Sequence, residues 1–257
     1  MNIIVYIKQT FDTEAKIVLD GSGKIDANGV NLIINPYDEY AIEEGIRLKE
    51  KLGGEVTVVS IGGARAQEAI RTALAMGIDK AVLVSDPALE NSDERTNAEV
   101  LAKVVSQIPY DIILAGRIAI DDGASQIAVS LAEILNVPSI TSVLKLDITG
   151  TQVTATREID GGTELIEVSL PVVITAQKGL NDPRYPSVAG IMKSKKKPLQ
   201  TMTLADLGLS SEDIAPKMNV DKFSLPTARQ GGRKIPGEVA QAAQELARLL
   251  REEAKVL

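Results

Sequence analysis

The stretch DIILAGRIAIDDGASQIAVSLAEIL, residues 111–135, sets the pattern of the chain. It opens at 111–115 with a short apolar run of the kind that forms a buried parallel strand. Gly116 ends the run, and a polar loop of small residues centred on 121–123 follows. From Ile127 onward, apolar residues recur at helical spacing. This order points the free N–H groups of a helix at the carboxyl edge of a sheet, where they and the helix dipole favour a bound anion.

The same loop also fits a simpler interpretation. Aspartate and glycine are ordinary residues of helix caps and turns, so 121–123 can serve only to start the following helix. The loop by itself does not distinguish a nucleotide site from a cap, and the rest of the chain has to decide between them.

Composition narrows the class of protein. The chain has 257 residues, of which 44% are hydrophobic and 25% charged, as in a globular protein with one large domain or one domain with an arm. The net charge of -7 disfavours general attraction to nucleic acid or to anionic membranes. The sequence contains no Cys and no His. This excludes Cys–His nucleophiles, Ser–His triads, Cys/His zinc sites and disulfides.

The N-terminal sequence MNIIVYIKQ enters a strand directly and lacks the regions of a signal peptide. No apolar run approaches the length that spans a membrane. We therefore expect a cytoplasmic protein without membrane insertion.

Strand-like and helix-like segments alternate through the first half of the chain. Apolar runs predict strands at 3–7, 56–61, 81–84 and 111–115, and apolar residues at helical spacing predict helices at 37–52, 65–76, 96–107 and from 127. Such alternation predicts right-handed crossovers and a mainly parallel sheet with helices on both faces, Rossmann-like and of the adenine-nucleotide-binding type. After Pro138 the pattern changes to period-two alternation at 141–146, 151–157 and 164–170, which predicts antiparallel additions to the same sheet.

The predicted helix at 37–52 has a clear start. Asn35 stands in the position of a cap, and Pro36 suits the first turn. The helix is expected to bury one face and to expose the charged face opposite. The buried face consists of Ala41, Gly45, Leu48 and Leu52.

Ligands of open α/β sheets bind outside the carboxyl ends of the strands, where the strand order reverses. Three segments meet at that edge in the predicted sheet: the surroundings of Tyr6, the pair Ile61-Gly62, and the loop 116–126. No G-x-G-x-x-G motif opens a helix after the first strand, and no P-loop is present. The pattern favours an adenine nucleotide held by backbone groups over a standard dinucleotide site.

The C-terminal part has a different character. Residues 198–233 contain Pro, Gly and charges with little periodicity, which predicts an extended arm. Residues 237–255 predict an amphipathic helix whose apolar face comprises Val239, Ala242, Ala243, Leu246, Leu249 and Leu250. This helix can pack on a partner chain or fold back on its own sheet.

Several long motifs resemble the electron-transfer flavoprotein β subunit family. The most specific is ATREIDGG at 155–162, followed by Glu164, Ile166 and PVVIT at 171–175. Matching motifs flank it at 35–37, 47–50, 71–77, 119–121, 180–185 and 191–197. The resemblance covers residues 1 to about 205 in register.

The resemblance implies one subunit of a heterodimer. In this family the α subunit makes most contacts to a redox-active FAD, and the β subunit supports it and buries an AMP. In a bifurcating branch, a second FAD occupies the AMP pocket. The positions that match the family's AMP contacts are Tyr6, Asn35, Pro36, Tyr37, Asp38, Ile61, Gly116, Arg117, Ile118, Ala119, Ile120, Asp121, Asp122, Gly123, Ala124, Ser125, Gln126 and Ile127.

Physical roles follow for these positions. Backbone at Tyr6 and Ile61, with Asn35, would edge or cover the adenine. Asp121 or Asp122 would accept ribose hydroxyls, and the N–H groups of 124–126 with the Ser125 hydroxyl would hold the phosphate. Two carboxylates beside a phosphate are electrostatically unfavourable, so one of them is equally well explained as a helix cap.

Residues 180–197 resemble the family's partner-recognition loop, whose tip offers an apolar anchor to client dehydrogenases such as acyl-CoA dehydrogenases. Val188 occupies the anchor position, where leucine is common in relatives. The lysine-rich run 193–197 has the simpler explanation of a solvated patch, or it can steer acidic clients. Nucleic acid is the weakest explanation, because no aromatic residues interleave the lysines. The candidate partner contacts are Tyr185, Val188, Ile191, Met192 and Lys193.

The loop sequence favours AMP over a second FAD. Bifurcating relatives carry Asp-Gly-Asp or Asp-Gly-Gly followed by Gln-Val-Gly-Pro. Here Asp122 stands in place of the glycine, and Ala128-Val129 in place of Gly-Pro. The extra carboxylate would crowd and repel a second phosphate. The respiratory branch usually continues with Asn-Gln-Thr, which this chain also lacks.

We therefore expect an α/β nucleotide-binding domain at 1–197, including the recognition loop 180–197, and an arm with a helix at 198–257 that packs on the partner subunit. An electron-carrier subunit needs no catalytic side chain, which agrees with the absence of His and Cys. The alternative is a stand-alone nucleotide-using enzyme, such as an ATP-hydrolysing one. That alternative would need a phosphate-gripping motif or a set of metal-binding carboxylates, and neither is evident in the sequence.

Overall fold

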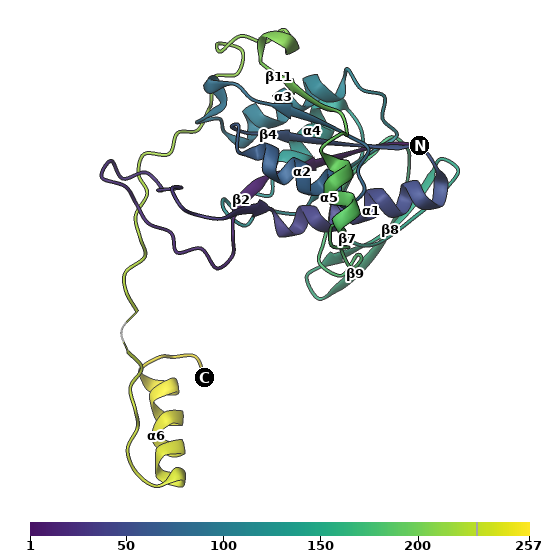
Figure 1. The fold of residues 1–257 in the computed structure, drawn as a ribbon. Coiled ribbons are helices and arrows are strands. Elements are labelled where there is room, and N and C mark those ends of the chain that lie inside the picture. The colour runs from purple at the N-terminus through teal and green to yellow at the C-terminus, as the bar shows by residue number, and fades with distance from the viewer. Residues whose placement is uncertain (230) are drawn as a thin grey trace. The chain divides into compact units, whose positions relative to one another are not determined.

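A computed structural model describes residues 1–229 and 231–257 (Figure 1). The chain forms two compact units, which are described separately. The larger comprises Met1–Ile17 and Asp26–Asp221, and the smaller comprises Val18–Ile25 and Lys222–Leu257.

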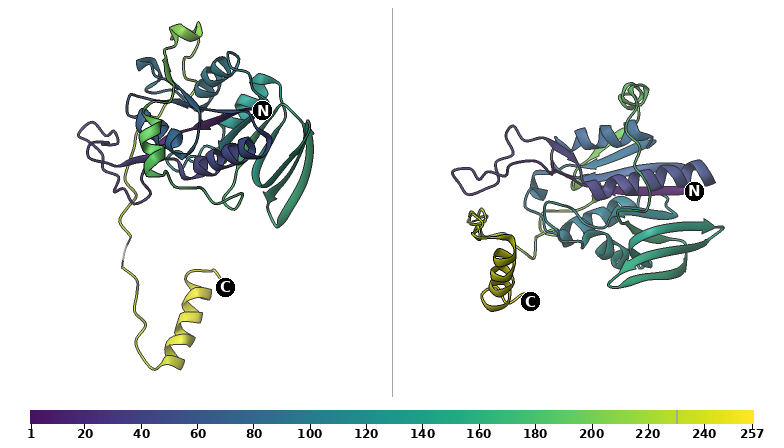
Figure 2. Two further views of the ribbon diagram at one scale, coloured as in Figure 1. Left: turned by 45° about the vertical axis from the view of Figure 1, so that its right-hand side comes forward. Right: turned by 90° about the horizontal axis from the view of Figure 1, so that it is seen from below.

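The larger unit is built on a nine-stranded sheet. The strands lie in the order β11 (Leu199–Met202), β5 (Lys80–Val84), β4 (Glu55–Ile61), β1 (Asn2–Ile7), β6 (Ile112–Gly116), β10 (Val172–Ala176), β7 (Ser139–Thr149), β8 (Gln152–Ile159) and β9 (Gly162–Ser169). Neighbours from β11 to β7 are parallel, and β7, β8 and β9 are antiparallel (Figure 2). A separate antiparallel pair joins β2 (Gln9–Phe11) to β3 (Leu32–Ile34).

Helices cover both faces of the sheet. The helices of the larger unit are α1 (Pro36–Leu52), α2 (Ala66–Met76), α3 (Glu94–Val105), α4 (Ile127–Leu135) and α5 (Val188–Ser194), with 3-10 turns at Pro87–Leu89 and Ala205–Leu207. The smaller unit contains α6 (Val239–Glu252). Alternate residues of β1 enter different cores, as the pleat requires. Ile3 and Val5 pack with side chains of α1 and α2, whereas Ile4 and Tyr6 pack with side chains of α3 and α4. The predicted fold class is confirmed.

The arm begins later than the sequence pattern predicts. Leu199–Met202 adds an edge strand beside β5, and the side chains of Leu204, Leu207 and Ile214 are buried in the core with α3. The larger unit therefore continues to Asp221. This strand could not be predicted from the sequence, because LQTM is too short and alternates too weakly to be recognised without the neighbouring strand β5.

The predicted orientation of α1 needs two corrections. Asn35 occupies the cap position, but its side chain makes no capping hydrogen bond. Leu52 is 40% exposed, whereas Glu43 and Glu44, on the face expected to be solvated, are buried. The acidic face of α1 is therefore covered by another part of the larger unit.

The opposite edge of the sheet is formed by β9. Its residues alternate, with Ile166 and Val168 packed toward the core and Leu165 70% exposed. Glu164 pairs with Arg157 of the neighbouring strand.

In the smaller unit, α6 is amphipathic as predicted, and none of its residues is buried in the described structure. Val239 is 85% exposed and Leu246 47%. Within the described parts of the chain, no helix combines the length and the hydrophobicity needed to cross a membrane.

Asp93 fastens the segment that follows β11. Its carboxylate caps α3 by accepting from the Thr96 N–H at 2.8 Å, and it also accepts from the N–H groups of Lys217 at 2.6 Å and Met218 at 3.0 Å. Burial opposes ionisation, but these hydrogen bonds outweigh it and lower the pKa of Asp93 to about 2.

We expect Asp93→Asn to destabilise the larger unit at pH 7 by on the order of 1–2 kcal/mol, allowing for solvent screening. Because the folded-state pKa lies below the unfolded one, the stabilisation is complete above about pH 4 and is lost as the pH falls through about 2. Urea titrations of both proteins between pH 7 and pH 2 measure the difference. A gap that persists undiminished at low pH would contradict the electrostatic explanation.

Candidate nucleotide site

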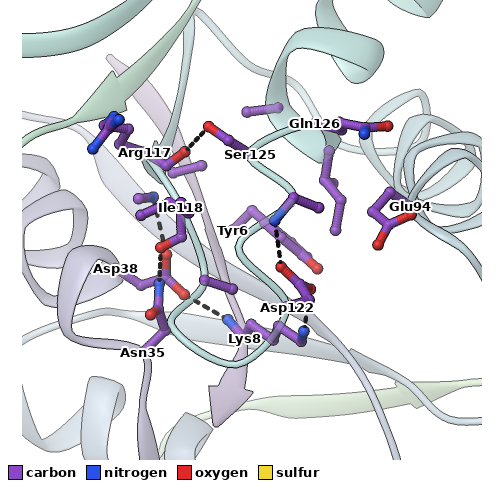
Figure 3. Close-up of a pocket in the computed structure, with 16 residues that line it drawn as sticks. Tyr6, Lys8, Asn35, Asp38, Glu94, Arg117, Ile118, Asp122, Ser125 and Gln126 are labelled. Atoms are coloured by element: carbon purple, nitrogen blue, oxygen red, sulfur yellow. Dashed lines mark hydrogen bonds and ion pairs between the residues drawn. The ribbon is translucent and has the colours of Figure 1, made fainter. Parts of the chain in front are cut away.

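The candidate site lies at the topological switch point of the sheet. From the central strand β1 the chain proceeds to β4 on one side and later returns to β6 on the other. The carboxyl ends of β1 and β6 therefore flank a crevice, the position at which open α/β sheets bind ligands. A pocket opens there (Figure 3), lined by Tyr6, Lys8, Asn35, Asp38, Glu94, Ala115, Gly116, Arg117, Ile118, Ala119, Asp122, Ala124, Ser125, Gln126, Ile127 and Ala128.

Asp38 joins the two strand ends at the floor of this pocket. Its carboxylate accepts the backbone N–H of Lys8 at 2.7 Å and that of Gly116 at 3.0 Å. Burial raises the pKa of Asp38 to about 7, and the hydrogen bonds from Lys8 and Gly116 limit the rise. Gly116 is required for this contact, because a Cβ at that position would lie 2.3 Å from Asp38 Oδ1.

The loop between β6 and α4 is held by its own contacts and by Asn35. The Asn35 amide donates to the Ile118 carbonyl at 2.9 Å, and its oxygen accepts from the Ile120 N–H at 3.2 Å. The Ser125 hydroxyl donates to the Arg117 carbonyl at 2.6 Å, with Ser125 itself in the left-handed region at φ 56°. These contacts give the loop a defined shape.

Lys8 is the main residue that the sequence analysis missed. Its ammonium contacts Asp121 Oδ1 at 2.9 Å and Asp122 Oδ2 at 2.5 Å (Figure 3 shows Lys8 beside Asp122). Burial favours the neutral amine, but the bonds to Asp122 and Asp121 outweigh it and raise the pKa of Lys8. Its position in the sequence could have indicated this role, because a lysine directly after β1 lies at the same edge of the sheet as the acidic loop after β6.

The start of α4 faces the pocket without a side-chain cap. Gln126 occupies the cap position, and no side-chain hydrogen bond caps the helix within the described chain. Asp122 instead accepts the Ala124 N–H at 2.9 Å within the loop. The capping explanation for the two aspartates is therefore wrong. The first-turn N–H groups of a helix lack intrahelical acceptors, so those of α4 are available to an anion.

Most predicted nucleotide contacts converge on the pocket. Asp121 lies next to the pocket and forms an ion pair with Lys8. Ile61 is the last residue of β4 and is partly buried in the core. Two predicted phosphate donors have partners inside the loop, the Ala124 N–H and the Ser125 hydroxyl. The predicted residues outside the pocket lining are Pro36, Tyr37, Ile61, Ile120, Asp121 and Gly123, and the unpredicted lining residues are Lys8, Glu94, Ala115 and Ala128.

A second candidate surface lies on the segment 180–197, called here the docking segment. It contains the short helix α5, which the sequence analysis treated as loop. Tyr185 is 94% exposed, Val188 79% and Met192 70%, while Ile191 is half-exposed and Lys193 lies in the last turn of α5. Among the described residues, no cluster of three or more acidic side chains is arranged to hold a metal ion.

Comparison with known proteins identifies the family of this chain. The family model described as electron transfer flavoprotein domain matches residues 22–207. The electron transfer flavoprotein subunit beta of Bacillus subtilis (strain 168) is 50% identical over 258 residues, covering 100% of both chains. The chain belongs to the electron transfer flavoprotein family, as a β subunit.

Other β subunits of the family are similar over nearly the same length. That of Syntrophomonas wolfei subsp. wolfei is 46% identical over 257 residues, covering 100% of this chain and 98% of its own. The human protein is 39% identical over 242 residues, covering 91% of this chain and 92% of its own. The resemblance noted in the sequence is confirmed.

Proposed function

We propose that this chain is the β subunit of a heterodimeric electron carrier whose FAD is held mainly by an α subunit, with an AMP in the switch-point pocket. The observation that carries the proposal is the pocket between β1 and β6, lined largely by the loops to which the resemblance to this family assigns the nucleotide contacts. FAD, when bound by the heterodimer, supplies the redox chemistry. This chain supplies binding, support and client recognition, so it needs no catalytic side chain.

The residues of the pocket fit a nucleoside monophosphate. The uncapped start of α4 offers N–H groups to one phosphate, and the backbone beside Tyr6 offers an edge to the base. Lys8 offsets only one of the two charges of Asp121 and Asp122. The rim therefore keeps negative charge, which disfavours the second phosphate of a dinucleotide.

We expect the purified heterodimer to release one FAD and one AMP per dimer when it is denatured. Chromatography of the supernatant, with both nucleotides quantified by absorbance, measures the ratio. Release of two FAD and no AMP would instead identify a bifurcating flavoprotein with FAD in this pocket. Release of neither nucleotide would contradict the proposal that the heterodimer binds FAD and AMP.

The docking segment is proposed as the contact to client dehydrogenases, with acyl-CoA dehydrogenases as the first class to test. Its exposed side chains Tyr185, Val188 and Met192 form an apolar surface, with lysines beside it. Exposed aromatic and aliphatic side chains on a fixed element are typical anchors of protein interfaces. The neighbouring lysines would raise the rate of association with an acidic partner.

We expect Val188→Ala to lower the efficiency of electron delivery from a client about tenfold and to leave the bound flavin unchanged. The loss corresponds to roughly 1.4 kcal/mol of apolar contact at the anchor. Steady-state reduction of the heterodimer by a reduced acyl-CoA dehydrogenase measures the effect. Val18→Ala, at another exposed valine outside the segment, is the control. Equal kinetics for the two variants would exclude Val188 as the anchor.

A further inference from the structure

The docking segment is fastened to α1 before α5 begins. Asn181 is buried, and its amide donates to the Tyr40 carbonyl and to Glu44, both at 3.0 Å. Three residues later, Arg184 contacts two further glutamates of α1. This segment therefore covers the acidic face of α1 that the sequence predicted to be solvated.

Arg184 makes a two-sided ion pair. Its guanidinium donates to both carboxylate oxygens of Glu43, at 2.8 and 3.1 Å, and to both of Glu50, at 2.7 and 3.1 Å. The Arg184 backbone N–H also donates to Glu43, at 3.1 Å. The Glu43 side chain is only 3% exposed. A planar fork of donors is needed for this geometry, and a lysine ammonium cannot reproduce it.

A second fastening follows α5. Arg71 of α2 donates to the carbonyls of Ser194 at 2.6 Å and Lys197 at 3.3 Å, at the end of α5. The Lys197 ammonium donates to the carbonyls of Leu74 at 2.8 Å and Ile78 at 2.5 Å, at the end of α2. Each of the two helices thus has a cation bound at its carboxyl-terminal end, where the helix dipole favours positive charge.

Between these two fastenings, α5 lies directly on α2. A Cβ at Gly190 would be 2.3 Å from the Ala75 carbonyl, so glycine permits the close approach of the two backbones. The side chains that face solvent, such as Tyr185 and Val188, contribute little to this packing, because they are largely exposed.

We propose that Arg184 and Lys197 are positioning residues that hold the docking segment in its binding shape before a client arrives, and this rests on the client-docking function proposed above. A segment ordered in advance does not lose backbone and side-chain freedom on association, which increases affinity. Lys197 therefore differs in role from Lys193, Lys195 and Lys196, which are exposed and free to act on a client at long range.

Hydrogen exchange of the intact heterodimer, without any client, tests the ordering directly. We expect Arg184→Lys to speed amide exchange within 181–197 about tenfold or more. The control is Arg95→Lys, which makes the same change at the Glu99 ion pair of α3 and should leave this segment unaffected. Flavin content shows that each variant is assembled. Should Arg184→Lys fail to assemble, Glu50→Gln removes only the exposed half of the ion pair.

Kinetics with a reduced acyl-CoA dehydrogenase test whether the ordered docking segment strengthens binding of the client. We expect Lys197→Met to raise the KM for the client about tenfold with little change in kcat, and Lys197→Arg to retain normal values. Lys196→Met removes one exposed charge from the same run. It should slow association and weaken its salt dependence, without speeding amide exchange within 181–197.

The outcomes separate the two proposals. If amide exchange within 181–197 is unchanged in both Arg184→Lys and Lys197→Met, the positioning role is overturned, regardless of the KM measured for the client. Faster exchange with an unchanged KM also overturns it, provided that Val188→Ala raises the KM. If Val188→Ala leaves the KM unchanged as well, the client-docking function fails, while faster exchange still supports the ordering by Arg184 and Lys197.

Discussion

Removal of residues 237–257 should prevent formation of a stable heterodimer while the larger unit stays folded. The deleted helix α6 contributes no buried residue to the described structure, so its loss leaves the core of the larger unit intact. Its apolar face includes Leu246, Leu249 and Leu250. Burying three leucines halfway against a partner is worth roughly 3–4 kcal/mol, or two to three orders of magnitude in affinity.

Co-purification of the truncated chain with a tagged α subunit, followed by flavin quantification, measures this loss. The point variant Leu246→Glu should reproduce most of it, because it places a charge in the apolar face. Gln244→Glu adds the same charge on the polar face and should assemble normally. A truncated chain that still forms a complex with normal flavin content would show that the partner does not use α6.

Replacement of Gly116 by Ala should destabilise the larger unit by about 3 kcal/mol and abolish nucleotide retention. The added Cβ would lie 2.3 Å from Asp38 Oδ1 and 2.7 Å from the Tyr37 carbonyl carbon. Since one of these is a backbone atom, the start of α1 would have to move away from β6. The Asp38 carboxylate would then lose its hold on the N–H groups at the ends of β1 and β6.

Denaturant unfolding and AMP quantification test this variant together. Gly63→Ala is the matched control, because it adds the same methyl group at the same edge of the sheet with no atom within 4 Å. A Gly116→Ala protein with normal stability and a full complement of AMP would refute the role given to this close approach.

The parallel core could be predicted because its signals are local. Strands β1, β4, β5 and β6 are short apolar runs separated by helices, and the polar loop after β6 indicates the start of α4. The antiparallel strands β7, β8 and β9 were predicted from their alternation. The edge strand β11 was missed because its placement depends on β5, more than a hundred residues earlier.

The candidate site was predicted less completely, for a similar reason. Lys8 follows a strand and carries no motif, so its importance arises only when the fold brings Asp121 and Asp122 against it. The buried carboxylates of Glu43 and Glu44 looked like an exposed helix face, since their partners Arg184 and Asn181 are more than 130 residues away. Long-range ion pairs of this kind leave no periodic pattern in a sequence.

The edge strand β9 has a consequence for the amount of this subunit that a cell can make. An unpaired strand edge beside an exposed Leu165 can pair with other chains, and the charge of Glu164 gives only local protection. Chains made in excess of their partner would leave the apolar face of α6 uncovered in addition to this edge. We therefore expect production of the two subunits to be matched, with surplus copies of this one taken up by chaperones or degraded.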